Sequence, residues 1–185
     1  NRELMINGTG PFLEPITIHF EGIQEPSQAK VVEGCWDATN DWALLELEKD
    51  LTLAEPMQLA ILPEGVKVEL ESFGYPLEHG SLTVAGVVRD AKATYFDATV
   101  IQLFSEELAA GEGVPLNGLS GAPCVVGHYA VGLVRASPLK EKREFDFSKA
   151  YTVKNGVLYA CPPTQLAAIC GDLLPPPIQL SFESV

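Results

Sequence analysis

One serine of this chain lies between two glycines, in the stretch NGLSGAP at residues 117–123. A serine hydroxyl is a weak nucleophile unless a neighbouring base takes its proton and backbone N–H groups stabilise the negative charge that develops on the substrate. Glycine lets the backbone approach a substrate closely because it has no Cβ atom. The stretch therefore indicates a nucleophilic Ser120 with an oxyanion hole. Taken alone, it is equally typical of an ordinary turn between strands.

The same residues resemble the G-x-S-G-x-P signature of trypsin-like serine proteases, which have the chymotrypsin fold. Other segments match that family in order and spacing: NDWALLEL at 40–47 is similar to the strand that carries the triad aspartate, AVGLVRAS at 130–137 to the strand that lines the substrate cleft, and VLYACP at 157–162 to the strand before the final helix. The segment from Ser72 to Val88 resembles the bacterial HtrA-like branch. The resemblance extends from about Ile16 to Cys170, which is most of the chain.

The resemblance implies acyl transfer from a polypeptide substrate to a serine. Ser120 would attack the peptide carbonyl, Asp41 would orient the catalytic histidine, and the N–H groups of Gly118 and Ser120 would bind the oxyanion. Asp37 is a poorer choice than Asp41 because no apolar strand follows it directly. The pocket and cleft residues implied by the family pattern are Val114, Pro115, Leu116, Arg135, Ala136 and Ser137. The apolar Val114 favours small or apolar substrate side chains, and Arg135 or Glu112 in the substrate pocket would reverse that preference.

The segment that carries the catalytic histidine in this family has no counterpart with a histidine between Ile16 and Asp41 that fits the pattern. The resemblance places this histidine at or upstream of Asn1, or on a companion fragment. Of the three histidines present, His19 is expected on the polar face of a strand. His128 lies at the tip of a hairpin, roughly 16 Å along the chain from Ser120 at ~3.3 Å per residue. His79 is a weak fallback in a turn, where a polar loop residue is the simpler interpretation.

Two further comparisons concern the class of serine hydrolase that the sequence resembles and the way in which its site is activated. The G-x-S-x-G elbow of α/β-hydrolases fits less well, because residue 122 is alanine and no long helix follows Ser120. Leu119 occupies the position where digestive enzymes carry an aspartate that pairs with a newly formed N-terminus. We therefore do not expect the amine of Asn1 to activate the site.

Short β-branched runs between scattered glycines and prolines predict an all-β chain. The expected strands are 16–20, 29–36, 42–48, 57–62, 66–73, 81–95, 99–105, 122–127, 129–137, 147–153 and 157–161, and a helix is expected at 163–170, ended by Gly171. The resemblance implies two antiparallel six-stranded Greek-key barrels, the first of them incomplete. The expected domains are 1–76 with Asp41, 77–162 with Ser120, a helical segment at 163–174 and an extended tail at 175–185. The tail is either loose or an added strand at a sheet edge, and we expect it to be loose.

Composition fits a globular domain, since 46% of the 185 residues are hydrophobic and 20% are charged. The formal net charge of -13 repels nucleic-acid phosphates and anionic lipid, so neither nucleic acid nor a membrane is expected as a partner. No apolar stretch reaches the ~18 residues of a membrane span, and no signal peptide is visible.

Four cysteines, Cys35, Cys124, Cys161 and Cys170, show no C-x-x-C spacing and no nearby histidine, so no metal site is expected. Nothing in the sequence points to a cofactor. Buried free thiols are the expected state. The cysteines also do not match the disulfide positions of secreted trypsin-like enzymes, which favours a reducing, cytoplasmic location.

Two classes of function remain. The first is a serine endopeptidase whose histidine comes from an upstream segment or a companion fragment, and whose partner is that N-terminal fragment or a larger regulatory protein. The second is a protease-like domain that has lost catalysis and binds a partner protein. We favour the endopeptidase, because a binding domain has no chemical need for the serine, its glycines and the aspartate together.

Overall fold

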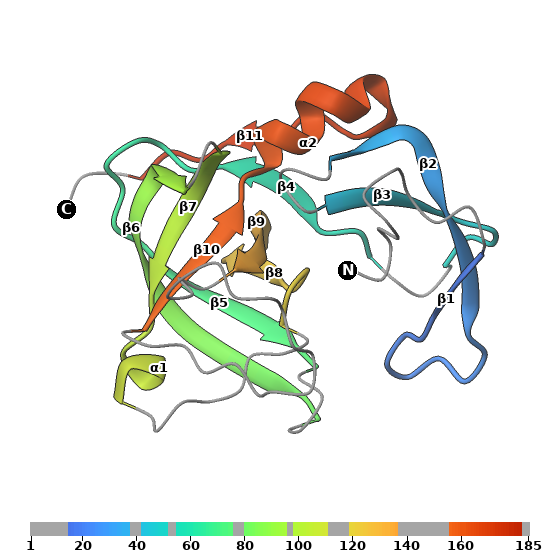
Figure 1. Ribbon diagram of the computed structural model, residues 1–185, viewed down its shortest axis with the longest axis horizontal. Helices are drawn as coiled ribbons and strands as arrows, with labels where there is room; N and C mark the ends of the chain where they lie inside the picture. Colours follow the sequence, from blue (N-terminus) through green and yellow to red (C-terminus); the bar gives the residue numbers. More distant parts are fainter. Residues whose placement is uncertain are drawn as a thin grey trace, which may run out of the picture. The chain divides into compact units, whose positions relative to one another are not determined.

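The computed structural model describes residues 15–37, 42–51, 55–75, 80–95, 98–110, 119–136 and 156–182. Chain contacts divide it into two compact units, each treated separately below (Figure 1). The N-terminal unit comprises Asn1–Pro56 with Leu166–Leu174, and the barrel unit comprises Met57–Gln165 with Pro175–Val185. The expected domain boundary at residues 76 and 77 falls inside the barrel unit.

The N-terminal unit holds a three-stranded antiparallel sheet in the order β1-β2-β3. Its strands are β1 (Ile16–Ile18), β2 (Ser27–Asp37) and β3 (Trp42–Leu47). The pairing of β2 with β3 shifts register between Val31 and Trp36, where Gly34 adopts a positive φ of 75°. A bulge of this kind bends a long strand, and glycine is the residue that adopts this φ without strain.

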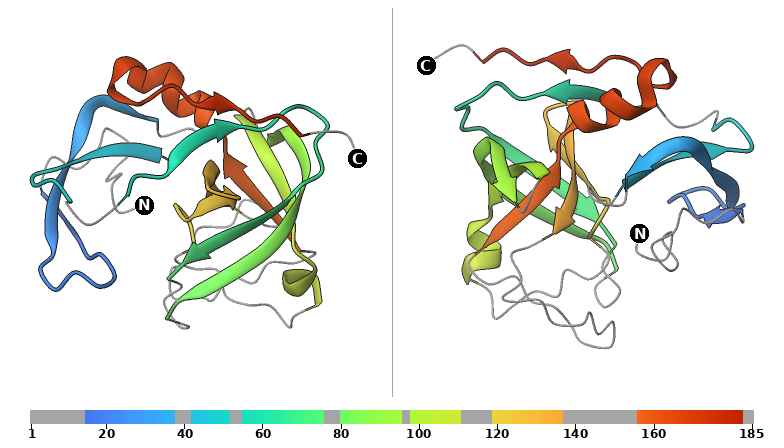
Figure 2. Two further views of the ribbon diagram at one scale, coloured as in Figure 1. Left: turned by 180° about the vertical axis from the view of Figure 1, so that it is seen from behind. Right: turned by 45° about the horizontal axis from the view of Figure 1, so that its top comes forward.

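The barrel unit holds six strands that pair all round: β5 (Glu69–Gly74), β6 (Leu82–Tyr95), β7 (Ala98–Phe104), β8 (Pro123–Val126), β9 (Tyr129–Ala136) and β10 (Val157–Cys161). Their order around the barrel is β5-β6-β7-β10-β9-β8, and the β5–β8 and β10–β9 pairings close it. Every pairing in this ring is antiparallel. The two views in Figure 2 show the barrel from different sides. Because the ring is closed, it has no unpaired edge strand that could pair with another chain.

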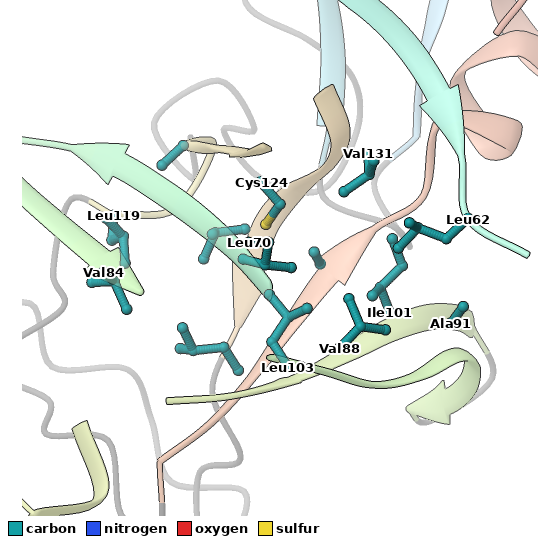
Figure 3. Packing of buried hydrophobic residues seen from close by; sticks show 14 of the residues in the cluster. Leu62, Leu70, Val84, Val88, Ala91, Ile101, Leu103, Leu119, Cys124 and Val131 are labelled. Atoms are coloured by element: carbon teal, nitrogen blue, oxygen red, sulfur yellow. The ribbon is translucent and has the colours of Figure 1, made fainter. Parts of the chain in front are cut away.

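The barrel interior is filled by one hydrophobic cluster, shown in Figure 3. Its most deeply buried large side chains include Val88, Ile101, Leu103, Leu119 and Val131. Strand β5 shows the underlying pattern, because its residues alternate between exposed and buried from Glu69 to Gly74, as a period-two strand on a core requires. The all-β architecture expected from the sequence is confirmed, and it includes a closed six-stranded antiparallel barrel.

The expected helix is present as α2 (Pro163–Cys170), and Gly171 ends it with φ 51°. A second, five-residue helix, α1 (Glu106–Ala110), was not expected. Its start is marked by Ser105, whose Oγ accepts a hydrogen bond from the backbone N–H of Leu108 at 3.4 Å. Serine at this position stabilises a helix N-terminus, so a signal for α1 was present in the sequence.

The C-terminal tail is not loose, and that expectation was wrong. Strand β11 (Ile178–Gln179) pairs in parallel with β4 (Gln58–Ile61), which itself pairs with β9. The N–H of Leu180 donates to the carbonyl of Ile61 at 3.0 Å. Ile178 and Leu180 pack against the barrel core, so the alternation of apolar and polar residues in the tail buries one side of it. Both views of Figure 2 show β11 alongside β4.

All four cysteines are free and buried, as expected. Burial raises the pKa of the Cys124 thiol to about 12, although the neighbouring Ser72 hydroxyl opposes this. The strand expected at 147–153 lies outside the described residues. In the part of the chain that the structure describes, no helix is long and apolar enough to cross a membrane.

Candidate functional site

Ser120 lies on a tight turn that directly precedes β8. Leu119, directly before it, is 0% exposed, whereas Ser120 itself is exposed. The N–H of Ala122 donates to the carbonyl of Leu119 at 2.9 Å and closes the turn. Gly121 has φ 88°, a left-handed conformation that a residue with a side chain rarely adopts. Because the side chain of Leu119 is buried in the core, the side chain of Ser120 directly after it is presented to solvent.

Two backbone hydrogen bonds fasten this turn to β9. The N–H of Gly121 donates to the carbonyl of Val134 at 2.7 Å, and the N–H of Val134 donates to the carbonyl of Ala122 at 2.8 Å. Both are at the short end of the usual range for N–H···O bonds. The backbone on either side of Ser120 is thus held by a strand of the closed barrel, which is the support that a precise site needs.

The Ser120 hydroxyl donates a long hydrogen bond, 3.5 Å, to the carbonyl oxygen of Arg135. A bond of this length is weak. It nevertheless places the Arg135 backbone beside the serine. Among the described residues, no imidazole or carboxylate is hydrogen-bonded to Ser120, so none of them activates the hydroxyl as a base would.

The structure brings together only part of the predicted site. Ser120, Arg135 and Ala136 are described, and both of the latter lie at the end of β9. Seven other predicted residues lie outside the described residues: Asp41, His79, Val114, Pro115, Leu116, Gly118 and Ser137. Their roles as triad acid, fallback base, pocket, oxyanion donor and cleft remain predictions.

The two other histidines are both exposed. His19 directly follows β1 in the N-terminal unit. His128 lies in the turn between β8 and β9, next to the Val126–Tyr129 pair, which is at the opposite end of β8 from Ser120. The hairpin-tip position of His128 is confirmed. His19 is exposed as expected, but it lies just after β1 and not within a strand.

Gly74, at the end of β5, packs directly against the Ser120 turn. A Cβ atom built at Gly74 would lie 2.8 Å from Leu119 Cδ1 and 3.2 Å from Ala122 Cβ, which are the two residues that flank Ser120 and Gly121. Carbon atoms in contact are normally about 3.5 to 4.0 Å apart. The glycine is therefore required by close packing, a role for which the sequence pattern offered no specific signal.

An aromatic pair lies within the electrostatic reach of Arg135. The rings of Tyr95 and Tyr159 stack with centroids 4.2 Å apart and planes at 28°. Burial raises the pKa of the Tyr95 hydroxyl, Tyr159 adds to this, and the positive charge of Arg135 acts in the opposite direction. Tyr159 also pairs with Ala136 across the β9–β10 ladder. The cation on β9 thus belongs to a partly aromatic surface that sequence reasoning did not identify.

No family model and no curated protein matches the chain. Solved structures do resemble it. The HtrA-type protease AlgW with decapeptide aligns with a TM-score of 0.54 at 18% identity, over 77% of this chain and 39% of that one. An inactive form of the Rv3671c protease aligns with a TM-score of 0.52 at 17% identity, over 78% and 66%. An inactive-form serine-to-alanine mutant of Rv3671c from M. tuberculosis H37Rv aligns with a TM-score of 0.51 at 15% identity, over 79% and 64%.

These similarities define the fold class: the chain has the chymotrypsin-like fold found in HtrA-type, trypsin-like serine proteases. The chain spans between 39% and 66% of the length of the three matching structures. Identities of 15% to 18% establish the fold, and activity has to be argued from the site itself.

Proposed function

We propose that this chain is the nucleophile-bearing part of a serine endopeptidase that cleaves peptide bonds through an acyl-enzyme. The observation that carries the proposal is the turn at Ser120, which exposes one hydroxyl on a backbone held by β9 and packed on β5. A preorganised backbone matters because oxyanion donors act without reorganising during the reaction.

In the proposed reaction, Ser120 Oγ attacks the peptide carbonyl while an imidazole takes its proton. The N–H groups of Gly118 and Ser120 donate to the oxyanion, and Asp41 orients the imidazole. The leaving amine departs with a proton from the imidazolium, and water then hydrolyses the acyl-enzyme. The histidine is supplied by a segment upstream of Asn1 or by a companion fragment.

The buried Leu119 bears on how such an enzyme is switched on. A side chain that is 0% exposed anchors the turn through apolar packing on the cluster in Figure 3. Apolar burial of a leucine stabilises by about 1.5 to 3 kcal/mol. The uncharged leucine side chain cannot form an ion pair with a newly cut N-terminus, and we propose that activation does not proceed through the amine of Asn1.

The proposed substrate is an extended polypeptide lying beside β9. The Arg135 carbonyl next to Ser120 is an acceptor suited to the N–H of the residue before the cut. We propose that Val114, Pro115, Leu116, Ala136 and Ser137 complete the pocket and cleft. The similar AlgW structure contains a decapeptide, which is consistent with a peptide ligand.

A protease-like domain that binds proteins without cleaving them is the second candidate. It is favoured by one observation, namely that no described residue activates Ser120. Loss of the triad histidine costs about 10⁶ in turnover, so the two candidates differ sharply in the measured rate.

The distinguishing experiment incubates the full-length protein with a broad peptide library and identifies products by mass spectrometry. We expect cleavage by the wild type and by Ser81→Ala, a control at another exposed serine, and a loss of about 10⁶ in Ser120→Ala. Retained cleavage in Ser120→Ala would exclude Ser120 as the nucleophile. Peptide binding without cleavage by the wild type would favour the binding domain.

A further inference from the structure

The outward face of β5 ends in two exposed aromatic side chains. Phe73 is 41% exposed and Tyr75 is 52% exposed. Their rings meet edge to face, with centroids 5.2 Å apart and planes at 84°. Gly74 between them faces the barrel interior. Large aromatic side chains bury much area at low entropic cost when a partner covers them, so an exposed pair beside a site is a candidate contact surface.

Strand topology fixes the position of this aromatic pair relative to Ser120. Strand β8 begins directly after the Ser120 turn, and it pairs with β9 along one edge and with β5 along the other. The turn itself is hydrogen-bonded to β9 at Val134 and packed against β5 at Gly74. The aromatic pair and the Arg135 backbone therefore lie on opposite sides of the serine.

We propose that Phe73 and Tyr75 bind a large apolar side chain of the substrate on the leaving-group side of the scissile bond. The inference rests on the proposed function, in which the β9 side receives the residues before the cut. An extended peptide that passes Ser120 from β9 must leave over the end of β5. Its first residues after the cut then meet the aromatic pair.

The charges on β5 specify the occupant further. Glu69 and Glu71 are exposed on the same face of the strand as Phe73, at two-residue intervals of about 7 Å. Carboxylates next to an apolar contact favour a cationic side chain further along the substrate. The occupant is therefore a peptide with phenylalanine, tyrosine or leucine directly after the cut and with lysine or arginine at a following position.

An added amine and water compete for the acyl-enzyme, and this competition measures how well the site binds groups on the leaving-group side. The experiment does not require cleavage of a full peptide. The full-length protein is acylated with a peptidyl methyl ester, and the dipeptide amide Phe-Lys-NH₂ or Ala-Lys-NH₂ is added. The amine attacks the acyl carbonyl, an amide bond forms, and the ester bond to Ser120 Oγ breaks with return of the proton to Oγ. The ratio of aminolysis to hydrolysis reports how well each amine binds.

We expect the wild type to prefer Phe-Lys-NH₂ over Ala-Lys-NH₂ by about tenfold or more. Phe73→Ala and Tyr75→Ala should each reduce this preference by about fivefold. Tyr75→Phe should keep the preference because it retains the ring. Phe182→Ala is the matched control, since Phe182 is 39% exposed but lies in the tail, and it should behave as the wild type does.

The outcomes separate this inference from the proposed function. Absence of ester hydrolysis in the wild type would overturn the proposed function and the inference with it. Normal ester hydrolysis with an unchanged amine preference in both alanine variants would overturn the inference alone. A loss of preference in Phe182→Ala equal to that in Phe73→Ala would also overturn it, because the effect would then not be local to β5.

Discussion

The packing of Gly74 against Leu119 predicts a strong energetic coupling between these two positions. Gly74→Ala places a Cβ atom 2.8 Å from Leu119 Cδ1, about 0.7 Å short of normal carbon–carbon contact. Leu119 is 0% exposed and has little room to withdraw. Leu119→Ala removes the atoms that the new Cβ would meet, so each substitution changes the effect of the other.

The expected magnitudes follow from the burial. Gly74→Ala alone should lower the free energy of unfolding by about 1 to 3 kcal/mol through overpacking. Leu119→Ala alone should lower it by about 3 to 5 kcal/mol, because a fully buried leucine leaves a cavity. The double variant should be less destabilised than the sum by about 1 to 2 kcal/mol, since the alanine at 74 occupies part of that cavity.

Native-state hydrogen exchange of the full-length protein, read on peptides covering β8 and β9, measures the opening free energy of the barrel unit. The control cycle pairs Leu119→Ala with Gly86→Ala, because a Cβ at Gly86 meets the backbone of Phe104 at 3.1 Å and not Leu119. That cycle should be additive within about 0.5 kcal/mol. If the effects of Gly74→Ala and Leu119→Ala were also additive within about 0.5 kcal/mol, this result would refute the packing of β5 on the Ser120 turn.

Three further predictions concern the acid, the thiols and the tail. Asp41→Asn in the full-length protein should lower peptide hydrolysis by about 10⁴ with an unchanged thermal melt, because the amide favours the wrong imidazole tautomer; an unchanged rate would show that Asp41 is not the triad acid. Burial raises the pKa of Cys124 to about 12 and of Cys170 to about 11 from 9.0, so the native state keeps protons that the unfolded state loses. The free energy of unfolding, measured by urea titration, should therefore fall as the pH rises above about 9, by up to about 1.4 kcal/mol per pH unit for each thiol. The fall should be shallower in Cys124→Ala, and an equal fall in the wild type and this variant would show that the Cys124 thiol is accessible. Ile178→Asp should release β11 and make the tail sensitive to limited proteolysis, whereas Ser181→Asp, at an exposed position, should leave it protected.

Local patterns were sufficient to predict most strands. Alternation along β5 and the proline, threonine and glycine around α2 are local signals, and each element lies within a few residues of its expected bounds. The tail was different because an exposed β4 edge and a core contact at Ile178 decide its conformation. Neither is visible in the residues of the tail itself, and tertiary contacts override weak local preference in so short a strand.

The candidate site shows the same division. Ser120 was predicted as the nucleophile from the glycines around it, and the left-handed Gly121 shows the physical need for one of them. The aromatic pair at Phe73 and Tyr75 was not identified, because the period of a strand predicts which way a side chain faces but not what lies beside it. Their proximity to Ser120 depends on β5 and β9 flanking β8, a pairing that joins segments distant in the sequence.

The most direct test of the central claim is to locate a fluorophosphonate adduct on the full-length protein by peptide mass spectrometry. Such probes react with an activated serine and not with ordinary hydroxyls. The account predicts one adduct, on Ser120, that is abolished in Ser120→Ala and retained in Ser81→Ala. An adduct on any other residue of the wild type, or no adduct when the full-length protein is folded and intact, would contradict the assignment of Ser120 as the nucleophile.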